Sequence, residues 1–380
     1  MIYLFWIAVA FIIYPYIGYP LYLYIQQRFQ PMSIVKGQIQ PTVTVVIGAR
    51  DEECAIAQRV NNLLQQDYPE DKLQIIVVSD GSIDRTVEIV QGFSDSRVHA
   101  VPLATNLGKA SALNAGVAAA QGEIIVFADA RQRFEPDVIQ QLVANFADAR
   151  VGCVSGELFF RKDATSTIQA EIGAYWKYEK WIRKAESATG SVVGATGAIY
   201  AIRRRLYQPL PRGTLLDDVL TPMRIVLQGY RTVFDGSAIA YDVVSQDTSQ
   251  EWKRKVRTLT GNWQLLSLQP VLLIPFANEN WFRFISHKVL RLIVPAALVG
   301  LLFSSFYLSG FLYRGVLGLQ LVSYFTAATG LSLPVARRLR FVNLSCFFVA
   351  MNAAVVTGFW RWITGRAASV WQPTCTDTKR

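Results

Sequence analysis

The sequence is short of charged residues, cysteine and histidine. Only 17% of its 380 residues are charged and 52% are hydrophobic, whereas about 25% of a typical globular domain is charged. The four cysteines have no CxxC spacing and there are only two histidines. This excludes a disulfide framework, a structural zinc site and a histidine-based metal centre. Any metal must therefore use carboxylate ligands, and part of the chain is expected to lie in lipid.

Basic residues outnumber acidic ones. The 38 Lys and Arg residues and 28 Asp and Glu residues give a formal net charge of +10. In a soluble protein this charge would suggest nucleic-acid binding, but in a membrane protein it more often reflects cytoplasmic positive charge beside anionic lipid. The positions of the uncharged runs decide between the two.

Uncharged apolar runs occur at both ends of the chain, and a helix of roughly 20 residues crosses a bilayer. Residues 1–27 predict a transmembrane anchor; a cleaved signal peptide is disfavoured because no basic n-region or small-residue cleavage site is present. The runs 292–313, 315–334 and 341–360 predict further spans. We therefore expect a soluble domain over 28–264, three transmembrane helices within 290–363 and a tail over 364–380.

Basic residues cluster beside these runs and predict the orientation. The positive-inside rule places the soluble domain in the cytoplasm, together with Arg28, Lys36, Lys288, Arg291, Arg337, Arg338 and Arg340. The tail, which also carries arginines, is then outside and does not fit the rule. The prediction is an integral protein of the bacterial inner membrane, and nucleic-acid binding is not needed to explain the charge.

The segment 265–289 begins with an apolar run, residues 265–276, which is too short and too interrupted to span, because Pro270 and Pro275 break it. We expect this segment in the membrane interface, with Trp281 and Phe282 at headgroup level. A buried loop of the soluble domain is the alternative.

The soluble domain alternates apolar strands with helical segments. Strands are predicted at 43–49, 73–80, 98–102 and 123–129, and helices at 55–66, 86–93 and 109–120. This order indicates a parallel sheet covered on both faces, whose ligands bind at the carboxyl ends of the strands. The polar residues there are candidates for a site, although the chain has no GxGxxG or Walker motif. Asp80 follows such a strand, and either contacts a nucleotide or caps the next helix.

Five motifs follow one another between the apolar runs: PTVTVVIGARDEE, KLQIIVVSDGSIDRT, NLGKASALNAGVAAAQGEIIVFADAR, LLDDVL and RKVRTLTGNW. Together they resemble the membrane-bound family 2 glycosyltransferases, which include cellulose synthase and hyaluronan synthase types. The resemblance covers about residues 41–290. It implies a Rossmann-like α/β domain of the GT-A type with one N-terminal and about three C-terminal transmembrane helices.

The resemblance also assigns donor-binding roles. The loop that begins at Ala49 and includes Glu52 matches the family's Pro-x-x-Asn-Glu loop beside uracil, with Gly for Pro and Asp for Asn. By the same matching, Asp80 contacts the uracil or ribose and Lys109 lies near the nucleotide. Asp129 matches the first carboxylate of the DxD motif, which holds Mg²⁺ or Mn²⁺ on the donor diphosphate.

Arg131 stands at the second DxD position and is the sharpest departure from the family pattern. A guanidinium cannot ligate a cation, but it pairs bidentately with phosphate. Two alternatives follow: Asp129 keeps the cation, which we favour, or Arg131 partly replaces it.

Asp217 and Asp218 match the family motif that supplies the catalytic base, with Asp218 as the base and Asp217 as its neighbour. They precede a predicted helix over 219–228, and an N-terminal position favours the ionised form that a base needs. From the residues alone, a pair of helix caps is the alternative reading.

Acceptor-side residues follow from two further segments. Thr196 and Gly197 lie in GATGAIYAIRR, which resembles the segment beneath the acceptor sugar; a tight turn is the alternative. The QxxRW motif of processive synthases aligns with residues 259–263, where only Trp263 is retained. Arg257 could supply the missing diphosphate contact. Processivity is therefore not implied.

The predicted function is an inverting transfer from a nucleotide sugar, UDP-linked, to a growing polysaccharide at the cytoplasmic face. Single transfer to a membrane lipid is one alternative. A catalytically silent nucleotide-binding partner of an export complex is another. The expected partners are the nucleotide sugar, a polysaccharide or lipid acceptor, membrane lipid and export or synthase proteins.

Overall fold

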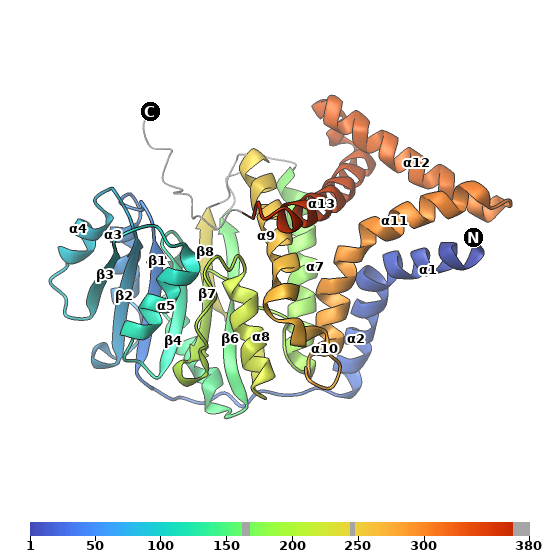
Figure 1. Cartoon of the computed structure of the whole chain (residues 1–380). Coiled ribbons are helices and arrows are strands. Elements are labelled where there is room, and N and C mark those ends of the chain that lie inside the picture. Colours follow the sequence, from blue (N-terminus) through green and yellow to red (C-terminus); the bar gives the residue numbers. More distant parts are fainter. Residues whose placement is uncertain (162–167, 244–247, 368–380) are drawn as a thin grey trace.

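The structure is a computed structural model that describes residues 1–161, 168–243 and 248–367. Its centre is an eight-stranded sheet in the order β3-β2-β1-β4-β7-β6-β8-β5 (Figure 1). The strands are β1 Val43–Ala49, β2 Leu73–Asp80, β3 Val98–Leu103, β4 Ile124–Asp129, β5 Arg133–Phe134, β6 Val151–Arg161, β7 Ile199–Arg203 and β8 Arg231–Val243. The four predicted strands are confirmed and pair in parallel, whereas β7 runs antiparallel to β4.

Helices cover both faces of this sheet, as the strand pattern predicts. Val45 and Ile47 of β1 face one core and Val46 faces the other, because successive side chains of a strand point to opposite faces. The helices are α3 Ile56–Leu64, α4 Thr86–Gln91, α5 Lys109–Ala119, α6 Val138–Ala144 and α8 Asp217–Leu227. The parallel strands β1, β2 and β4 thus bring their carboxyl ends to one edge of the sheet.

Two long helices, α7 Ile168–Thr189 and α9 Thr248–Leu268, stand between the sheet and the apolar helices (Figure 1). The apolar helix α2 Tyr19–Phe29 packs on α7, and α13 Arg340–Ile363 packs on α9. The helix α9 continues through residue 264, where the sequence analysis ends the soluble domain, and that domain boundary stays a prediction.

Among the described residues, three helices are long and apolar enough to cross a membrane: Ile2–Phe29, Trp281–Tyr307 and Arg340–Ile363. The first joins α1 Ile2–Ile13 to α2 through a π-helical turn that contains Pro15, and such a turn bends a helix. The second joins α10 Trp281–Phe284 to α11 Leu290–Tyr307 in the same way.

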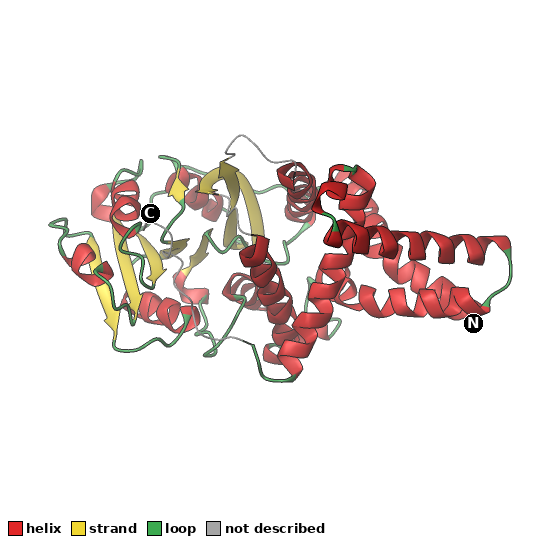
Figure 2. Ribbon diagram, turned by 90° about the horizontal axis from the view of Figure 1, so that it is seen from above, coloured by secondary structure: helices red, strands yellow, loops and turns green. Residues whose placement is uncertain are grey.

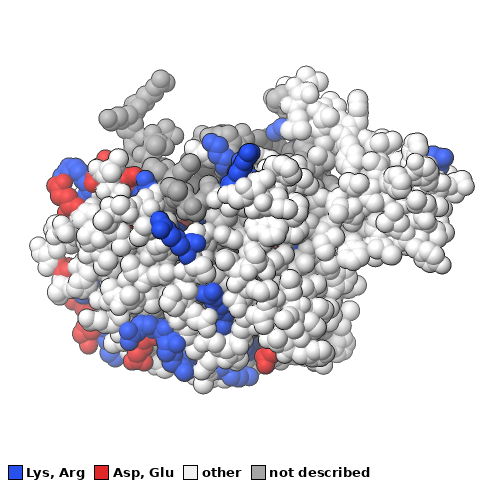
Figure 3. Space-filling model, viewed as in Figure 1, with Lys and Arg blue, Asp and Glu red and all other residues white. Residues whose placement is uncertain are grey.

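The helix α12 Phe311–Ser332 is long but does not reach that hydropathy, so the expected fourth span stays a prediction. Figure 2 shows the apolar helices extending away from the sheet, with the N-terminus at the far end. On the face seen in Figure 3, the arm that contains α1, α11 and α12 carries almost no charged side chains. This surface is the one expected in lipid.

The end of α13 lies against the soluble domain. A Cβ at Gly358 would lie 2.8 Å from the backbone nitrogen of Thr260, and Trp362 Nε1 donates to Ser267 Oγ at 3.3 Å. Because α9 also packs on the loop before α8 (Gly261 against Leu215 and Leu216), the end of α13 lies on the side of the domain. Most of the tail, residues 368–380, lies outside the described residues, so its expected position outside the membrane stays a prediction.

The segment predicted at the interface is partly buried and partly exposed. Leu265 belongs to α9 and Leu272 is buried, whereas Leu273, Ile274 and Phe276 are exposed. The buried residues Leu265 and Leu272 agree with the alternative of a buried loop. An exposed apolar loop of this kind is suited to the headgroup region, and that placement stays a prediction.

Candidate active site

Three predicted residues meet at the carboxyl edge of the sheet. Lys109, the first residue of α5, places its Nζ 2.9 Å from Asp129 Oδ1 at the end of β4 and 3.7 Å from Asp217 Oδ2 at the start of α8. Burial alone would lower the pKa of Lys109, but the charges of Asp129 and Asp217 outweigh it and the pKa is raised. Lys109 therefore remains a cation between two carboxylates.

Asp80 holds the loop that leads into α5. Its buried carboxylate accepts hydrogen bonds from the backbone N–H groups of Leu107 at 2.7 Å and Gly108 at 2.9 Å. Gly108 has φ +89°, a conformation that favours glycine, so the turn before Lys109 is fixed at both points. Asp80 therefore holds the turn before α5 and does not cap the next helix, α4, whose first N–H, that of Thr86, bonds to Asp84 Oδ1. Contact of Asp80 with a nucleotide stays a prediction.

The loop after β1 forms another wall of the site. Ala49 ends β1 and is buried, and Asp51 adopts φ +50° while its Oδ1 accepts from the N–H of Ile83 at 2.8 Å. Glu52 is buried, and Arg131 Nε lies 3.7 Å from its Oε1. The Arg131 side chain is 46% exposed, so it is anchored at one end and accessible to a ligand.

The surroundings of Asp129 are strongly basic. Lys109 contacts it, Arg131 follows two residues later, and the buried guanidinium of Arg59 interacts with its charge. Burial lowers the pKa of Arg59 to about 9, although Asp129 opposes this shift. No group of three His, Cys, Asp or Glu side chains that could hold a metal occurs among the described residues. A cation at Asp129 would therefore need oxygen ligands from a bound diphosphate.

Asp218 faces a different region from Asp217. A Cβ placed on Gly197 would lie 2.9 Å from Asp218 Oδ2, so glycine is needed for the loop 194–197 to approach this carboxylate. The N–H of Ala195 donates to the carbonyl of Asp218 at 2.7 Å. Burial and then the charge of Asp217 raise the pKa of Asp218 to about 6. The expected preference for the ionised form at the helix N-terminus is outweighed by these two effects.

Thr196 is buried next to this carboxylate. Its Oγ1 donates to the carbonyl of Gly156 at 3.1 Å and accepts from Arg183 Nη1 of α7 at 2.8 Å. The structure thus brings Thr196 and Gly197 to Asp218, as the sequence predicts, and adds Arg183.

A pocket of about 140 Å³ opens beside Asp218. Its lining comes from α7, the loop 193–195, α8, α9 and the helix that starts at α10: Glu179, Arg183, Glu186, Val193, Gly194, Ala195, Leu216, Asp218, Val219, Thr258, His287 and Lys288. The predicted base therefore faces a cavity at the junction of the soluble domain and an apolar helix.

Two predicted acceptor residues do not line this pocket. Trp263 stacks on Trp362 of α13 with ring centroids 6.1 Å apart and contacts Phe359 at 4.9 Å. Arg257 is exposed on α9. Trp263 is thus part of the packing between α9 and α13 in this structure.

Arg183 and Lys288 are the residues that the sequence analysis missed. Lys288 was counted as a charge beside a transmembrane run, but it lies within the helix and faces the pocket. Arg183 lies in a helix that is rich in charged residues. The one feature of the sequence that could point to the pocket is the position of Lys288 next to an apolar run.

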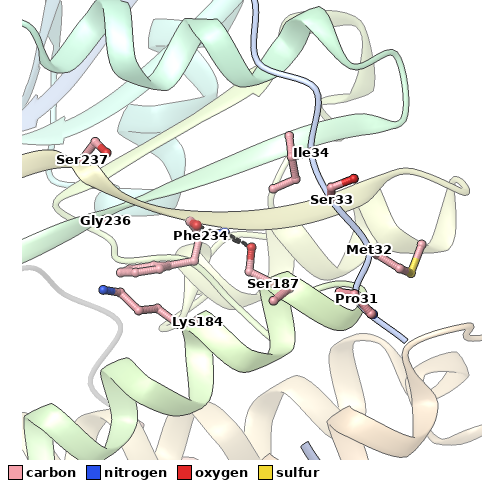
Figure 4. Close-up of a pocket in the computed structure, with 10 residues that line it drawn as sticks. Pro31, Met32, Ser33, Ile34, Lys184, Ser187, Phe234, Gly236 and Ser237 are labelled. Carbon is pink, nitrogen blue, oxygen red and sulfur yellow. Dashed lines mark hydrogen bonds between the residues drawn. The ribbon is translucent and has the colours of Figure 1, made fainter. Parts of the chain in front are cut away.

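A second, more open pocket of about 530 Å³ lies between residues 31–34, α7 and β8 (Figure 4). Lys184 is its only charged lining residue, and Ser187 Oγ accepts from the N–H of Phe234 at 2.9 Å. It contains none of the predicted site residues.

Residues 44–210 match the family model Glycosyl transferase family 2. The probable glycosyltransferase YdaM of Bacillus subtilis is 29% identical over 58% of this chain and 55% of its own length. A poly-beta-1,6-N-acetyl-D-glucosamine synthase of Staphylococcus epidermidis is 23% identical over 67% of this chain and 63% of its own. The chain thus spans less than two thirds of these relatives.

A mannosyltransferase from Pyrobaculum calidifontis, solved with GDP-Man and Mn²⁺, has a similar structure. It is 23% identical, with a TM-score of 0.71 over 96% of this chain and 99% of that one. The similarity extends over the apolar helices as well as the sheet and confirms the predicted GT-A-like fold.

Proposed function

We propose that the chain is a membrane-bound inverting glycosyltransferase that uses a UDP-linked sugar and a membrane-held acceptor. The match of residues 44–210 to the glycosyl transferase family 2 model supports this proposal. The observation that carries the proposal is the position of Lys109 between Asp129 and Asp217. The residue after Asp217 is Asp218, whose carboxylate faces a separate pocket. Donor and acceptor sides thus meet at two adjacent aspartates.

The donor diphosphate would lie at the edge formed by Asp129, Lys109 and Arg131. Lys109 and Arg131 supply positive charge that stabilises the departing diphosphate. Asp129 is the residue that would share Mg²⁺ or Mn²⁺ with the phosphate oxygens. When bound, the cation would offset leaving-group charge. Asp80 keeps Lys109 in place through the loop before α5.

Asp218 would act as the general base. It takes the proton from the acceptor hydroxyl as that oxygen attacks the anomeric carbon, the bond from that carbon to the diphosphate oxygen breaks, and UDP leaves. Attack opposite the leaving group inverts the anomeric configuration. A carboxyl group with a pKa of about 6 is a suitable base near neutral pH.

Two acceptors remain candidates. The similarity to poly-beta-1,6-N-acetyl-D-glucosamine synthases favours a growing polysaccharide. The packing of Trp263 against α13 favours single transfer to a lipid, because this tryptophan is not available under an acceptor sugar at Asp218. A catalytic domain in the cytoplasm of a bacterial inner-membrane protein would fit either acceptor.

The test uses the purified full chain and a panel of UDP- and GDP-sugars, and measures released nucleotide diphosphate and product mass. Turnover that Asp218→Asn abolishes would support the proposal, and product mass would separate polymer from single transfer. Nucleotide binding without release by any donor and acceptor pair would instead indicate a silent partner of an export complex.

A further inference from the structure

The pocket beside Asp218 is lined by three acidic residues, two permanent cations and a histidine. It lies between the soluble domain and Trp281–Tyr307, one of the helices apolar enough to span a membrane. Two of its lining residues, His287 and Lys288, belong to that helix. The pocket is therefore accessible to a molecule that approaches along a lipid-facing helix.

The two glutamates of the pocket are already paired. Glu179 lies 2.6 Å from Arg291 Nη1 and 3.1 Å from His287 Nε2, while Glu186 lies 2.8 Å from His287 Nδ1 and accepts from Tyr19 OH at 2.6 Å. Burial would raise the pKa of both carboxyl groups, but these partners lower it in each case. Neither glutamate lies within 4 Å of the Lys288 or Arg183 cation among the described residues.

The remaining cations are Lys288 and Arg183. Over residues 1–161, 168–243 and 248–367, Lys288 Nζ has no hydrogen bond and no carboxylate within 4 Å, and the hydrogen bond of Arg183 goes to the uncharged hydroxyl of Thr196 at 2.8 Å. The one other acid that lines the pocket is Asp218. Two cations without an ion-pair partner among the described residues therefore share a confined space with Asp218, and a buried charge without a partner favours binding of an anion.

We propose that Lys288 and Arg183 bind a phosphodiester group of a lipid acceptor and thereby present its neighbouring hydroxyl to Asp218. This inference rests on the proposed function and specifies its acceptor. A phosphodiester carries one negative charge, which together with ionised Asp218 balances the two cations. Ammonium and guanidinium groups are the usual protein ligands of phosphate.

The size of the pocket agrees with such a group. A cavity of roughly 150 Å³ holds one benzene-sized molecule, and this pocket measures about 140 Å³. It therefore has room for a phosphate and its nearest carbons but not for a chain of sugars. Because Lys288 is supplied by an apolar helix, we assign the source as lipid and not a soluble phosphate.

The first experiment measures lipid binding without catalysis. The full-length protein is placed in nanodiscs of phosphatidylcholine with phosphatidylglycerol, whose headgroup has a phosphodiester and free hydroxyls, and retained phosphatidylglycerol is counted by native mass spectrometry. Lys288→Met should weaken retention by roughly 10- to 100-fold, as expected for loss of a charged hydrogen bond. Lys288→Arg should restore it, and Lys184→Met, on the open pocket, is the matched control.

Equal retention of phosphatidylglycerol by wild type and Lys288→Met would overturn the inference. Soluble glycerophosphoglycerol that competes as strongly as the lipid itself would also overturn it.

The second experiment compares KM for phosphatidylglycerol with KM for diacylglycerol, which has the hydroxyl but no phosphate. Only the first KM should rise in Lys288→Met, while UDP affinity stays unchanged. If sugar is transferred but Lys288→Met changes neither KM, this inference is wrong and the proposed function stands. If no sugar is transferred to any acceptor, the proposed function is wrong.

Discussion

The carboxylates of Asp217 and Asp218 are adjacent in the chain but face different partners. Asp217 Oδ2 lies 3.7 Å from Lys109 Nζ on the donor side, whereas Asp218 lies against Gly197 and lines the pocket that contains Lys288. Successive residues of a helix point about 100° apart. One turn at the start of α8 therefore supplies a carboxylate to each of two sites.

Asp218→Asn should lower the transfer rate by about 10²- to 10⁴-fold, the usual contribution of a positioned base. UDP affinity, measured by calorimetry, should be unchanged because Asp218 does not face the donor side. Asp217→Asn should cost less rate, since Asp217 acts through Lys109. Equal activity of Asp218→Asn and wild type would remove Asp218 from the mechanism.

The rate should also fall at low pH, because a base with a pKa of about 6 is protonated below that value. Asp217 raises this pKa, while Lys109, Lys288 and Arg183 lower it. Asp217→Asn removes the raising charge and should move the acidic limb of the kcat profile to lower pH. A limb that does not move in this variant would show that another group controls it.

Gly197→Ala should reduce kcat, since the added methyl would lie 2.9 Å from Asp218 Oδ2 and push the base away. Gly194→Ala in the same loop is the matched control, because its methyl would meet Val219 Cγ2 at 3.2 Å and not the carboxylate. We expect a larger loss of kcat in the first variant, with equal melting temperatures. Equal losses would argue against close packing at the base.

The proximity of Lys109 and Asp129, the proposed donor side, could be predicted from the sequence because strand ends in a parallel sheet share one edge. Asp129 is the last residue of β4, and Lys109 comes after the loop that follows β3. The structure brings the two side chains together. Asp80 shows the limit: its position is predictable, but its two bonds to the loop at 107–108 depend on a turn that only the fold defines.

The acceptor side could not be predicted in the same way. The face of α9 that Trp263 occupies depends on where α13 docks, and these helices lie about 100 residues apart in the chain. From the sequence, Lys288 is read as a charge that flanks a transmembrane run. The sequence does not show that the helix includes Lys288 and packs beside α7. Tertiary packing between distant helices determines both outcomes.

Membrane topology can be tested by cysteine labelling in a variant that lacks the native cysteines. Ser309→Cys, between α11 and α12, should react with an impermeant reagent from outside intact cells. Thr364→Cys should not react, because the preceding Trp362 contacts Ser267 of α9 on the domain side. Both positions should react after permeabilisation. Labelling of Thr364→Cys in intact cells would restore the four-span arrangement with an external tail.

The final prediction concerns Asp129 and Arg131, two residues apart at the end of β4. If Asp129 shares a divalent cation with the donor, a chelator should remove activity and Asp129→Ala should be nearly inactive. Arg131→Ala should then chiefly raise KM for the donor, because the side chain is 46% exposed and its one ion pair among the described residues is a 3.7 Å contact with Glu52.

If the guanidinium has replaced the cation, activity should survive the chelator and Arg131→Ala should be as damaging as Asp129→Ala. We expect the first result, since one guanidinium offsets a single charge of a diphosphate and a divalent cation offsets two. Arg133→Ala, an exposed arginine two residues further on, is the control for general loss of basic charge. Full activity in both the Asp129 and Arg131 variants would show that the diphosphate binds elsewhere.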